Sequence, residues 1–140
     1  MAAMTSSYRH LRRVEFRDTD AAGIVHFSVF FNYMEEAEHS FLRNLGLDVF
    51  LIDGKTAISF PRVAARCDYR TPIRFGEVVA VEVALDKIGR SSVTYRFLFR
   101  RDETLIAEGQ VTAACCQLTE AGVPRAVSIP DDVRAILERA

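Results

Sequence analysis

The segment DTDAAGIVHF, residues 18–27, holds side chains that could carry out chemistry on a carbonyl group. Asp20 is ionised at neutral pH in an ordinary environment, so it could attack a carbonyl carbon or activate a water molecule. Gly23 lets backbone approach a ligand closely, and His26 could orient Asp20 or a water. An aspartate-rich turn before a helix is also a common cap, so the residue types alone leave a structural role for Asp20 open.

A second candidate region is the turn DKIGRSS, residues 86–92. Lys87 and Arg90 supply positive charge there, and Ser91 and Ser92 supply hydroxyl groups, a combination that could bind the phosphates of a ligand. An ordinary solvated hairpin fits the same residues equally well.

Several other kinds of chemistry are disfavoured by motifs that the sequence lacks. It has no P-loop, no Rossmann glycine fingerprint and no HExxH motif, and its three cysteines do not form a CxxC pair. We therefore expect neither a metal site nor a separate cofactor.

The element that must position the first segment is a long helix directly after it. Apolar residues recur at steps of three and four between Phe27 and Leu45, which predicts an amphipathic helix over residues 27–45. Gly46 follows at the position where a left-handed residue commonly ends a helix. Alternation of apolar and polar residues before the segment predicts a first strand over residues 11–17.

The rest of the chain is predicted to be mainly sheet, with strands over residues 62–70, 79–86, 93–99 and 104–118 and a short helix over residues 133–139. Consecutive strands joined by short turns are expected to pair antiparallel. One apolar helix face and one apolar sheet face favour an α+β fold, in which an antiparallel sheet of about five strands wraps around one central helix.

Length and composition point to one small globular domain, residues 1–140. The formal net charge of −1 gives no indication of a nucleic-acid-binding surface. The start of the chain lacks the pattern of a secretory signal, and no run of about 20 apolar residues is present, so we expect a cytoplasmic protein without a membrane span.

The segment of residues 18–27 resembles the signature D-x-D-x-x-G-[IV]-V of the 4-hydroxybenzoyl-CoA thioesterase family of hotdog-fold enzymes. The similarity continues through FFNYME at residues 30–35 and more loosely through YRTPIRFGE at residues 69–77. It therefore extends over most of the chain and implies the hotdog fold and the hydrolysis of an acyl-CoA thioester.

The resemblance also implies roles for individual residues. It makes Asp20 the catalytic carboxylate, as nucleophile or as general base, and Asp18 a structural residue. In the family the oxyanion donor is the backbone amide seven residues after the catalytic aspartate, which here is Phe27, and we place it at the N-terminal end of the helix, where amides lack partners. Gly23 and His26 complete the predicted site, although an aromatic residue stands at the histidine position in some relatives.

Three alternatives are left open by the sequence. Another branch of hotdog thioesterases uses a glutamate on the helix, for which Glu35 and Glu36 are the candidates. The chain could also be a non-catalytic acyl-CoA-binding sensor or carrier, or a hydratase of the same fold. The acyl group is undetermined, since aromatic and short- or medium-chain groups both fit a pocket lined by Phe and Met.

The resemblance further implies that the turn containing Lys87 and Arg90 meets the nucleotide end of coenzyme A, with Arg62, Arg66, Arg70 and Arg125 as weaker candidates. Because sheets of this fold pair edge to edge, we expect a homodimer or a homotetramer, with the site between subunits.

Overall fold

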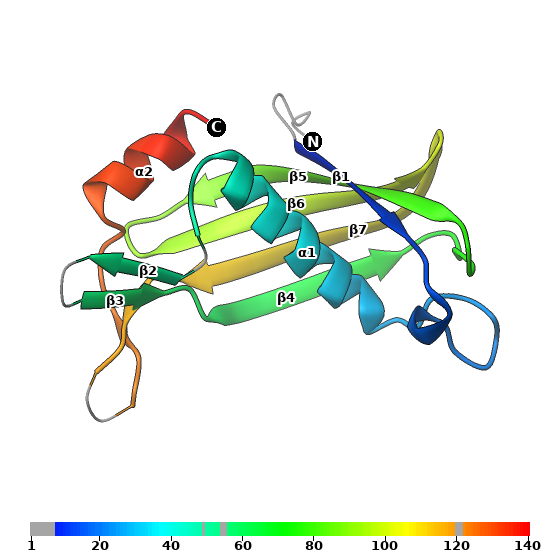
Figure 1. Ribbon diagram of the computed structural model, residues 1–140, viewed down its shortest axis with the longest axis horizontal. Coiled ribbons are helices and arrows are strands. Elements are labelled where there is room, and N and C mark those ends of the chain that lie inside the picture. Colours follow the sequence, from blue (N-terminus) through cyan, green and yellow to red (C-terminus); the bar gives the residue numbers. More distant parts are fainter. Residues whose placement is uncertain (1–7, 49, 54–55, 120–121) are drawn as a thin grey trace.

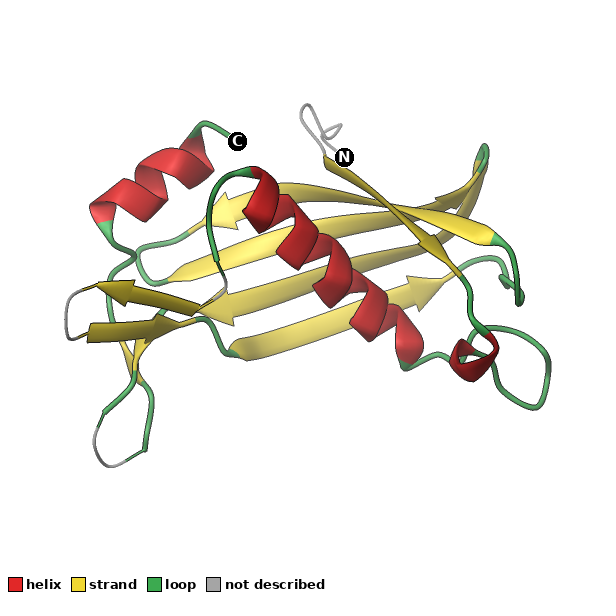
Figure 2. Cartoon of the chain, in the orientation of Figure 1, coloured by secondary structure: helices red, strands yellow, loops and turns green. Residues whose placement is uncertain are grey.

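The central helix α1 (Val29–Asn44) lies across one face of a curved sheet, as Figures 1 and 2 show. The computed structural model describes residues 8–48, 50–53, 56–119 and 122–140. No helix in these ranges is long and apolar enough to cross a membrane. The main sheet has the strand order β1-β5-β6-β7-β4, with β1 (Tyr8–Arg13), β4 (Arg62–Tyr69), β5 (Val78–Ile88), β6 (Ser92–Arg101) and β7 (Thr104–Ala114).

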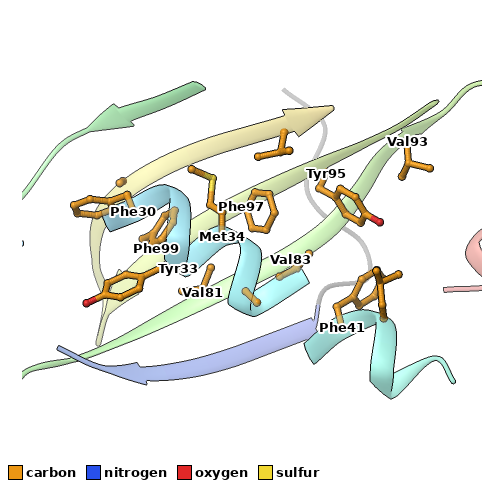
Figure 3. Packing of buried hydrophobic residues seen from close by; sticks show 14 of the residues in the cluster. Phe30, Tyr33, Met34, Phe41, Val81, Val83, Val93, Tyr95, Phe97 and Phe99 are labelled. Atoms are coloured by element: carbon orange, nitrogen blue, oxygen red, sulfur yellow. The ribbon is translucent and has the colours of Figure 1, made fainter. Parts of the chain in front are cut away.

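Every pair of neighbouring strands in this sheet is antiparallel. The predicted α+β architecture, a five-stranded antiparallel sheet packed on one long helix, is therefore confirmed. The core between the helix and the sheet is formed by the same periodic apolar residues that predicted these elements. In Figure 3, Phe30, Met34 and Phe41 of α1 face Phe97 and other buried residues of β5 and β6.

One glycine sets how closely the helix approaches the sheet. A Cβ atom on Gly109 of β7 would lie 2.3 Å from the sulfur of Met34. Met34 is fully buried, so the absence of a side chain at residue 109 lets α1 lie close against the middle of β7.

The prediction for the first strand was wrong in its bounds. β1 ends at Arg13, and a short 3-10 helix, η1 (Phe16–Asp18), follows in place of a continued strand. The Asp18 carboxylate accepts a hydrogen bond from the backbone N–H of Glu15 at 2.9 Å, which closes a local turn and draws the chain away from the sheet. Phe16 is consequently 78% exposed.

The prediction that the strands over residues 62–70 and 79–86 pair with each other was also wrong. β4 pairs with β7 at one edge of the sheet, and β5 lies between β1 and β6. The connection of residues 70–77 crosses the end of the sheet, where Arg70 and Thr71 both donate backbone hydrogen bonds to the carbonyl of Ile106. This crossing brings residues 69–73 beside the candidate catalytic segment.

A second, small sheet was not predicted. It joins β2 (Phe50–Asp53), β3 (Thr56–Ser59), β8 (Cys116–Gln117) and β9 (Arg125–Ala126) in the order β2-β3-β8-β9. The strand predicted over residues 104–118 is divided at Cys115, whose N–H donates to Ser91 and whose carbonyl accepts from Val127. The C-terminal helix α2 (Asp131–Glu138) begins two residues earlier than expected, directly after Pro130.

The central helix is shorter at its start than predicted. It begins at Val29 with Ser28 as its N-cap residue, and Leu45 caps its end before Gly46, which has a φ of +81°. Phe27 therefore lies just before the helix and outside its first turn.

Candidate active site

The loop that carries Asp20 is a narrow hairpin-like turn at one end of the sheet. Thr19 and Val25 form an isolated β-bridge at its base. At its tip, the N–H of Asp20 donates to the carbonyl of Ile24, and the N–H of Gly23 donates to the carbonyl of Asp20, each at 2.9 Å. Gly23 has a φ of +78°, a conformation that favours glycine, so the predicted requirement for glycine there has a conformational cause.

The loop is tied to the crossing segment of residues 70–77 as well as to the core. Ile24 forms a bridge with Arg74, and the N–H of Val25 donates to the carbonyl of Ile73 at 2.9 Å. The side chain of Val25 is buried. The position of Asp20 is therefore fixed by backbone contacts on both sides of it.

The Asp20 carboxylate has one anchored and one free oxygen. Oδ1 accepts a hydrogen bond from the backbone N–H of Ala22 at 2.8 Å. Among the described residues, none donates a hydrogen bond to Oδ2. The carboxylate is partly exposed, so one oxygen is held in place while the other is available to a ligand or a water.

Asp20 and Phe27 share a cavity of about 290 Å³. Phe30 and Tyr69 also line it, with their rings in edge-to-face contact at 5.1 Å between centroids. The cavity is thus a partly open, largely aromatic and aliphatic chamber with one carboxylate at its wall, and its other lining residues are Ile24, Val25, Arg70, Thr71, Pro72 and Ile73.

The backbone N–H of Phe27 has no hydrogen-bond acceptor among the residues that the structure describes. The neighbouring groups are occupied: the carbonyl of His26 accepts from the N–H of Val29 at 2.9 Å, and the carbonyl of Phe27 accepts from the Tyr69 hydroxyl at 2.8 Å. The Phe27 side chain is 63% exposed. A backbone N–H without an acceptor can donate to an oxyanion that forms during acyl transfer.

His26 makes its hydrogen bonds within its own turn. Its Nδ1 lies 2.7 Å from the hydroxyl of Ser28 and accepts from the N–H of Ser28 at 3.3 Å. Its ring packs against that of Phe27 at 4.6 Å between centroids. No hydrogen bond joins His26 to Asp20 in the described part of the chain, so the geometry gives this histidine the role of holding the turn before α1.

Asp18 lies at the centre of a buried polar network under the loop. Its carboxylate accepts from the hydroxyl of Tyr33 at 2.7 Å and lies 3.4 Å from the guanidinium of Arg12. Its backbone carbonyl accepts from the N–H of His26. Burial, followed by the contact with Asp18, raises the pKa of Tyr33, so its hydroxyl stays a donor. The network joins β1, the loop and α1.

The helix glutamates lie away from this cavity. Glu36 forms an ion pair with Arg12 at 2.8 Å, and the side chain of Glu35 is 58% exposed and 3.9 Å from Arg62. Sequence reasoning missed Glu38, which is buried one turn further along and accepts from Arg62 at 2.6 Å. Burial, partly offset by Arg62, raises the pKa of Glu38 to about 7.

The predicted coenzyme A turn joins β5 to β6, at the opposite end of the sheet from the loop between β1 and α1 that carries Asp20 (Figure 1). β5 runs from the Asp20 end at Val78 to this turn after Ile88, a span of about 33 Å at roughly 3.3 Å per residue. Lys87 and Arg90 are exposed, and Arg90 Nε donates to the Ser128 hydroxyl at 3.1 Å.

The backbone carbonyls of the two serines in this turn accept hydrogen bonds from other backbone groups. The carbonyl of Ser92 accepts from the N–H of Gly89 at 2.7 Å, and the carbonyl of Ser91 accepts from the N–H of Cys115. Their side chains are half-buried. A single chain therefore does not bring this turn to the Asp20 cavity.

Sequence reasoning also missed the far wall of the cavity. Tyr69 and Ile73 belong to the segment that carried the looser part of the resemblance, but no role was assigned to them. The only signal was that resemblance, because the contact between residues 69–73 and the loop depends on the crossing connection. No group of three or more His, Cys, Asp or Glu side chains in the described ranges is arranged to hold a metal ion.

Comparisons with known proteins agree with this arrangement. A family model described as the thioesterase-like superfamily matches residues 14–137. A putative esterase from Aquifex aeolicus is 31% identical over 137 residues, which are 91% of this chain and 94% of the relative. A 1,4-dihydroxy-2-naphthoyl-CoA hydrolase from Prochlorococcus marinus is 32% identical over 109 residues, 72% of each chain.

Among solved structures, the BH1999 gentisyl-coenzyme A thioesterase is similar with a TM-score of 0.80 and 31% identity, covering 93% of this chain and 99% of that one. The match to the family model begins after β1 and ends within α2, so it includes the Asp20 loop, α1, four of the five strands of the main sheet and the residues that line the cavity. The predicted hotdog fold and the predicted enzyme class, a thioester hydrolase, are thereby confirmed, and the chain belongs to the thioesterase-like superfamily.

Proposed function

We propose that this protein hydrolyses an acyl-CoA to a free acid and coenzyme A, with Asp20 as the reacting carboxylate and the Phe27 N–H as oxyanion donor. The observation that carries the proposal is that two residues lining one cavity of about 290 Å³ offer these groups: Asp20 a carboxylate with one free oxygen, and Phe27 a backbone N–H without an acceptor in the described part of the chain. Gly23 permits the turn that holds them together, and His26 fixes the backbone between them and α1.

The chemistry follows from these two groups. An oxygen nucleophile adds to the thioester carbonyl carbon, the carbonyl oxygen becomes an oxyanion that accepts from the Phe27 N–H, and the C–S bond then breaks to release coenzyme A as its thiolate. The nucleophile is either Asp20 Oδ2, which gives a mixed anhydride that water later hydrolyses, or a water deprotonated by Asp20. Both routes use the same placement of the carboxylate, so both remain within the proposal.

The cavity walls favour an aromatic acyl group. The edge-to-face rings of Phe30 and Tyr69 offer the geometry in which a further aromatic ring packs well. The volume is at the low end for a ligand pocket, so it suits the acyl group and leaves coenzyme A outside. The two similar proteins named for naphthoyl-CoA and gentisyl-CoA agree with this choice. Short- and medium-chain acyl-CoAs are the comparison substrates.

A homodimer is part of the same proposal. β4 is an edge strand of eight residues, and Val63 on it is a large apolar side chain that is 63% exposed. A long edge with exposed apolar residues is suited to pairing with a second copy. Light scattering should then return at least twice the chain mass of 15.7 kDa at micromolar concentration. A monomer under these conditions would contradict the proposed dimer.

A non-catalytic acyl-CoA-binding protein is the second candidate. The bond from the Ala22 N–H to Asp20 Oδ1 favours it, because that bond alone gives Asp20 a structural function in the turn. A binder would have affinity for acyl-CoA without releasing thiol.

The deciding experiment is Asp20→Asn, assayed by release of free thiol from aromatic, short-chain and medium-chain acyl-CoAs. The amide oxygen can still accept from Ala22, so the fold and acyl-CoA binding should be kept. An amide is neither a nucleophile nor a base, and kcat should fall at least ~100-fold.

Asp132→Asn is the matched control, since it removes one exposed carboxylate from α2 and should leave kcat unchanged. Full activity in a folded Asp20→Asn variant would refute the assignment. Binding without turnover by the unmodified protein would favour the second candidate.

A further inference from the structure

A hydrogen bond joins the end of β4 to the segment just before α1. The Tyr69 hydroxyl donates to the carbonyl of Phe27 at 2.8 Å, across 42 positions of sequence. Phe27 lines the cavity, and its N–H has no acceptor among the described residues. Tyr69 therefore contacts the backbone of the proposed oxyanion donor from outside the loop and outside the helix.

This contact completes the fixing of two consecutive peptide groups. The carbonyl of His26 is held by the N–H of Val29, and the N–H of Ser28 is held by Nδ1 of His26. In a trans peptide the C=O and N–H bonds point in opposite directions, so holding the His26 carbonyl toward the helix turns the Phe27 N–H away from it. The Phe27 carbonyl and the Ser28 N–H belong to the next peptide group, which is held from two sides: by the Tyr69 hydroxyl at 2.8 Å and by His26 Nδ1 at 3.3 Å.

Phe27 has few other restraints. Its side chain is 63% exposed, and it precedes the first residue of α1, so neither core packing nor helical hydrogen bonding fixes it. Tyr69 is better fixed, because its ring packs edge-to-face on Phe30, which is 4% exposed. Partial burial and the Cys67 thiol raise the pKa of Tyr69 to about 12, which keeps its hydroxyl a donor at neutral pH.

We infer that Tyr69 is a positioning residue for thioester hydrolysis: its hydroxyl holds the carbonyl of Phe27 and so limits backbone rotation at the residue whose N–H is the proposed oxyanion donor. This inference rests on the proposed function. A preorganised donor stabilises the transition state more than the ground state, because it is aimed where the negative charge develops. Loss of the hydroxyl should therefore lower kcat and leave KM unchanged.

The test is Tyr69→Phe, which keeps the ring against Phe30 and removes only the hydroxyl. We expect kcat for the best acyl-CoA to fall roughly 3- to 10-fold with KM within twofold of the unmodified protein, the loss expected for one hydrogen bond of ordinary strength. In ¹H–¹⁵N NMR spectra the amide signals of Phe27 and Ser28 should shift.

Tyr8→Phe is the matched control. It also removes one tyrosine hydroxyl, which contacts the Ser40 hydroxyl at 2.6 Å and lies outside the residues lining the cavity. Both variants should lose a similar, small amount of thermal stability and keep the oligomeric mass of the unmodified protein. Only Tyr69→Phe should change kcat, so an effect through stability alone would appear in both variants.

Each other outcome overturns the inference. An unchanged kcat in Tyr69→Phe would mean that the bond does not orient the donor. A raised KM with unchanged kcat would mean that the hydroxyl binds substrate instead. If Asp20→Asn is inactive while Tyr69→Phe is fully active, the inference fails and the proposed function stands; if the unmodified protein turns over no acyl-CoA, both fail.

Discussion

Glu38 leads to a specific prediction about stability and pH. Its side chain is 2% exposed in the middle of α1, with one oxygen 2.6 Å from Nη2 of Arg62. Removal from water disfavours the charged carboxylate more than Arg62 favours it, and the pKa of Glu38 is raised from 4.5 to about 7. At pH values between these two, the Glu38 carboxyl therefore keeps its proton in the folded protein and releases it in the unfolded chain.

The direction and size of the change in the free energy of unfolding with pH follow from this difference in proton binding. Between about pH 4.5 and pH 7 the folded state binds more protons than the unfolded state, so the free energy of unfolding falls as the pH rises through this range. The folded-state pKa lies about 2.5 above the ordinary value, and each whole pKa corresponds to about 1.4 kcal/mol. Glu38 should thus destabilise the ionised protein by about 3 kcal/mol, most of which develops between pH 5 and pH 8.

The assay is urea denaturation of the unmodified protein and of Glu38→Gln at pH 5, 6, 7 and 8. Glutamine has nearly the same shape, can still accept from Arg62 and does not ionise, so the difference between the two proteins isolates the titration of Glu38. The unmodified protein should lose about 2–3 kcal/mol relative to the variant across this range.

Glu103→Gln, which changes an exposed carboxylate in the turn between β6 and β7, should follow the unmodified protein at every pH. Parallel stability curves for Glu38→Gln and the unmodified protein would refute the reasoning. They would mean that Arg62 offsets the whole cost of burying the Glu38 carboxylate.

Three other substitutions test features of the fold and the site. Gly109→Ala should lower the free energy of unfolding by about 1–3 kcal/mol, measured by urea denaturation, because its Cβ would lie 2.3 Å from the Met34 sulfur. Gly23→Ala should lower the free energy of unfolding by about 1–2 kcal/mol and reduce kcat, since a φ of +78° is unfavourable with a side chain although the nearest atom, Nη1 of Arg74, would lie 3.9 Å from the new Cβ; an unchanged kcat would mean that the loop conformation does not affect catalysis. Arg90→Ala should raise KM, more at low salt than at high salt, with kcat unchanged; a KM equal to that of the unmodified protein at low ionic strength would exclude this turn from coenzyme A binding.

The elements that were predicted well are those whose own residues bury one face. Alternate residues of β6 are buried from Val93 to Phe99, so the period of two in the sequence reflects the core directly. The same holds for α1, where Phe30, Met34, Ala37 and Phe41 give the helical period and end on the sheet. Where side-chain burial decides the structure, the local pattern was enough.

The elements that were predicted poorly are those decided by backbone or long-range contacts. The strand over residues 11–17 was given the wrong bounds because a side-chain contact between Asp18 and the Glu15 N–H competes with strand pairing. The pairing of β4 with β7 was missed because a connection of eight residues can form either a hairpin or a crossing. The choice depends on long-range backbone contacts: the start of the connection donates to Ile106, and Ile73 within it accepts from Val25.

The residues of the candidate site also fall into those that a local pattern could predict and those that a long-range contact brings in. Asp20, Gly23 and Phe27 lie within eight positions of one another, so a sequence signature could group them, and they do border or shape one cavity. Tyr69, the last residue of β4, contacts Phe27 because β4 ends beside the loop, where the crossing connection that follows it also pairs with the loop. A contact across 42 positions has no local pattern from which it could be predicted.

The coenzyme A turn shows how strand register limits what one chain can do. β1 pairs with β5 so that Arg13 lies opposite Val78, which puts the Asp20 loop at the start of β5 and the Arg90 turn beyond its other end. If two copies paired antiparallel along β4, as in the proposed dimer, the second sheet would run in the opposite direction. Its Arg90 turn would then lie at the same end of the joined sheet as Asp20 of the first copy. A binding role for Arg90 therefore requires the dimer, and a KM effect of Arg90→Ala in a protein that stays monomeric would contradict this account of the site.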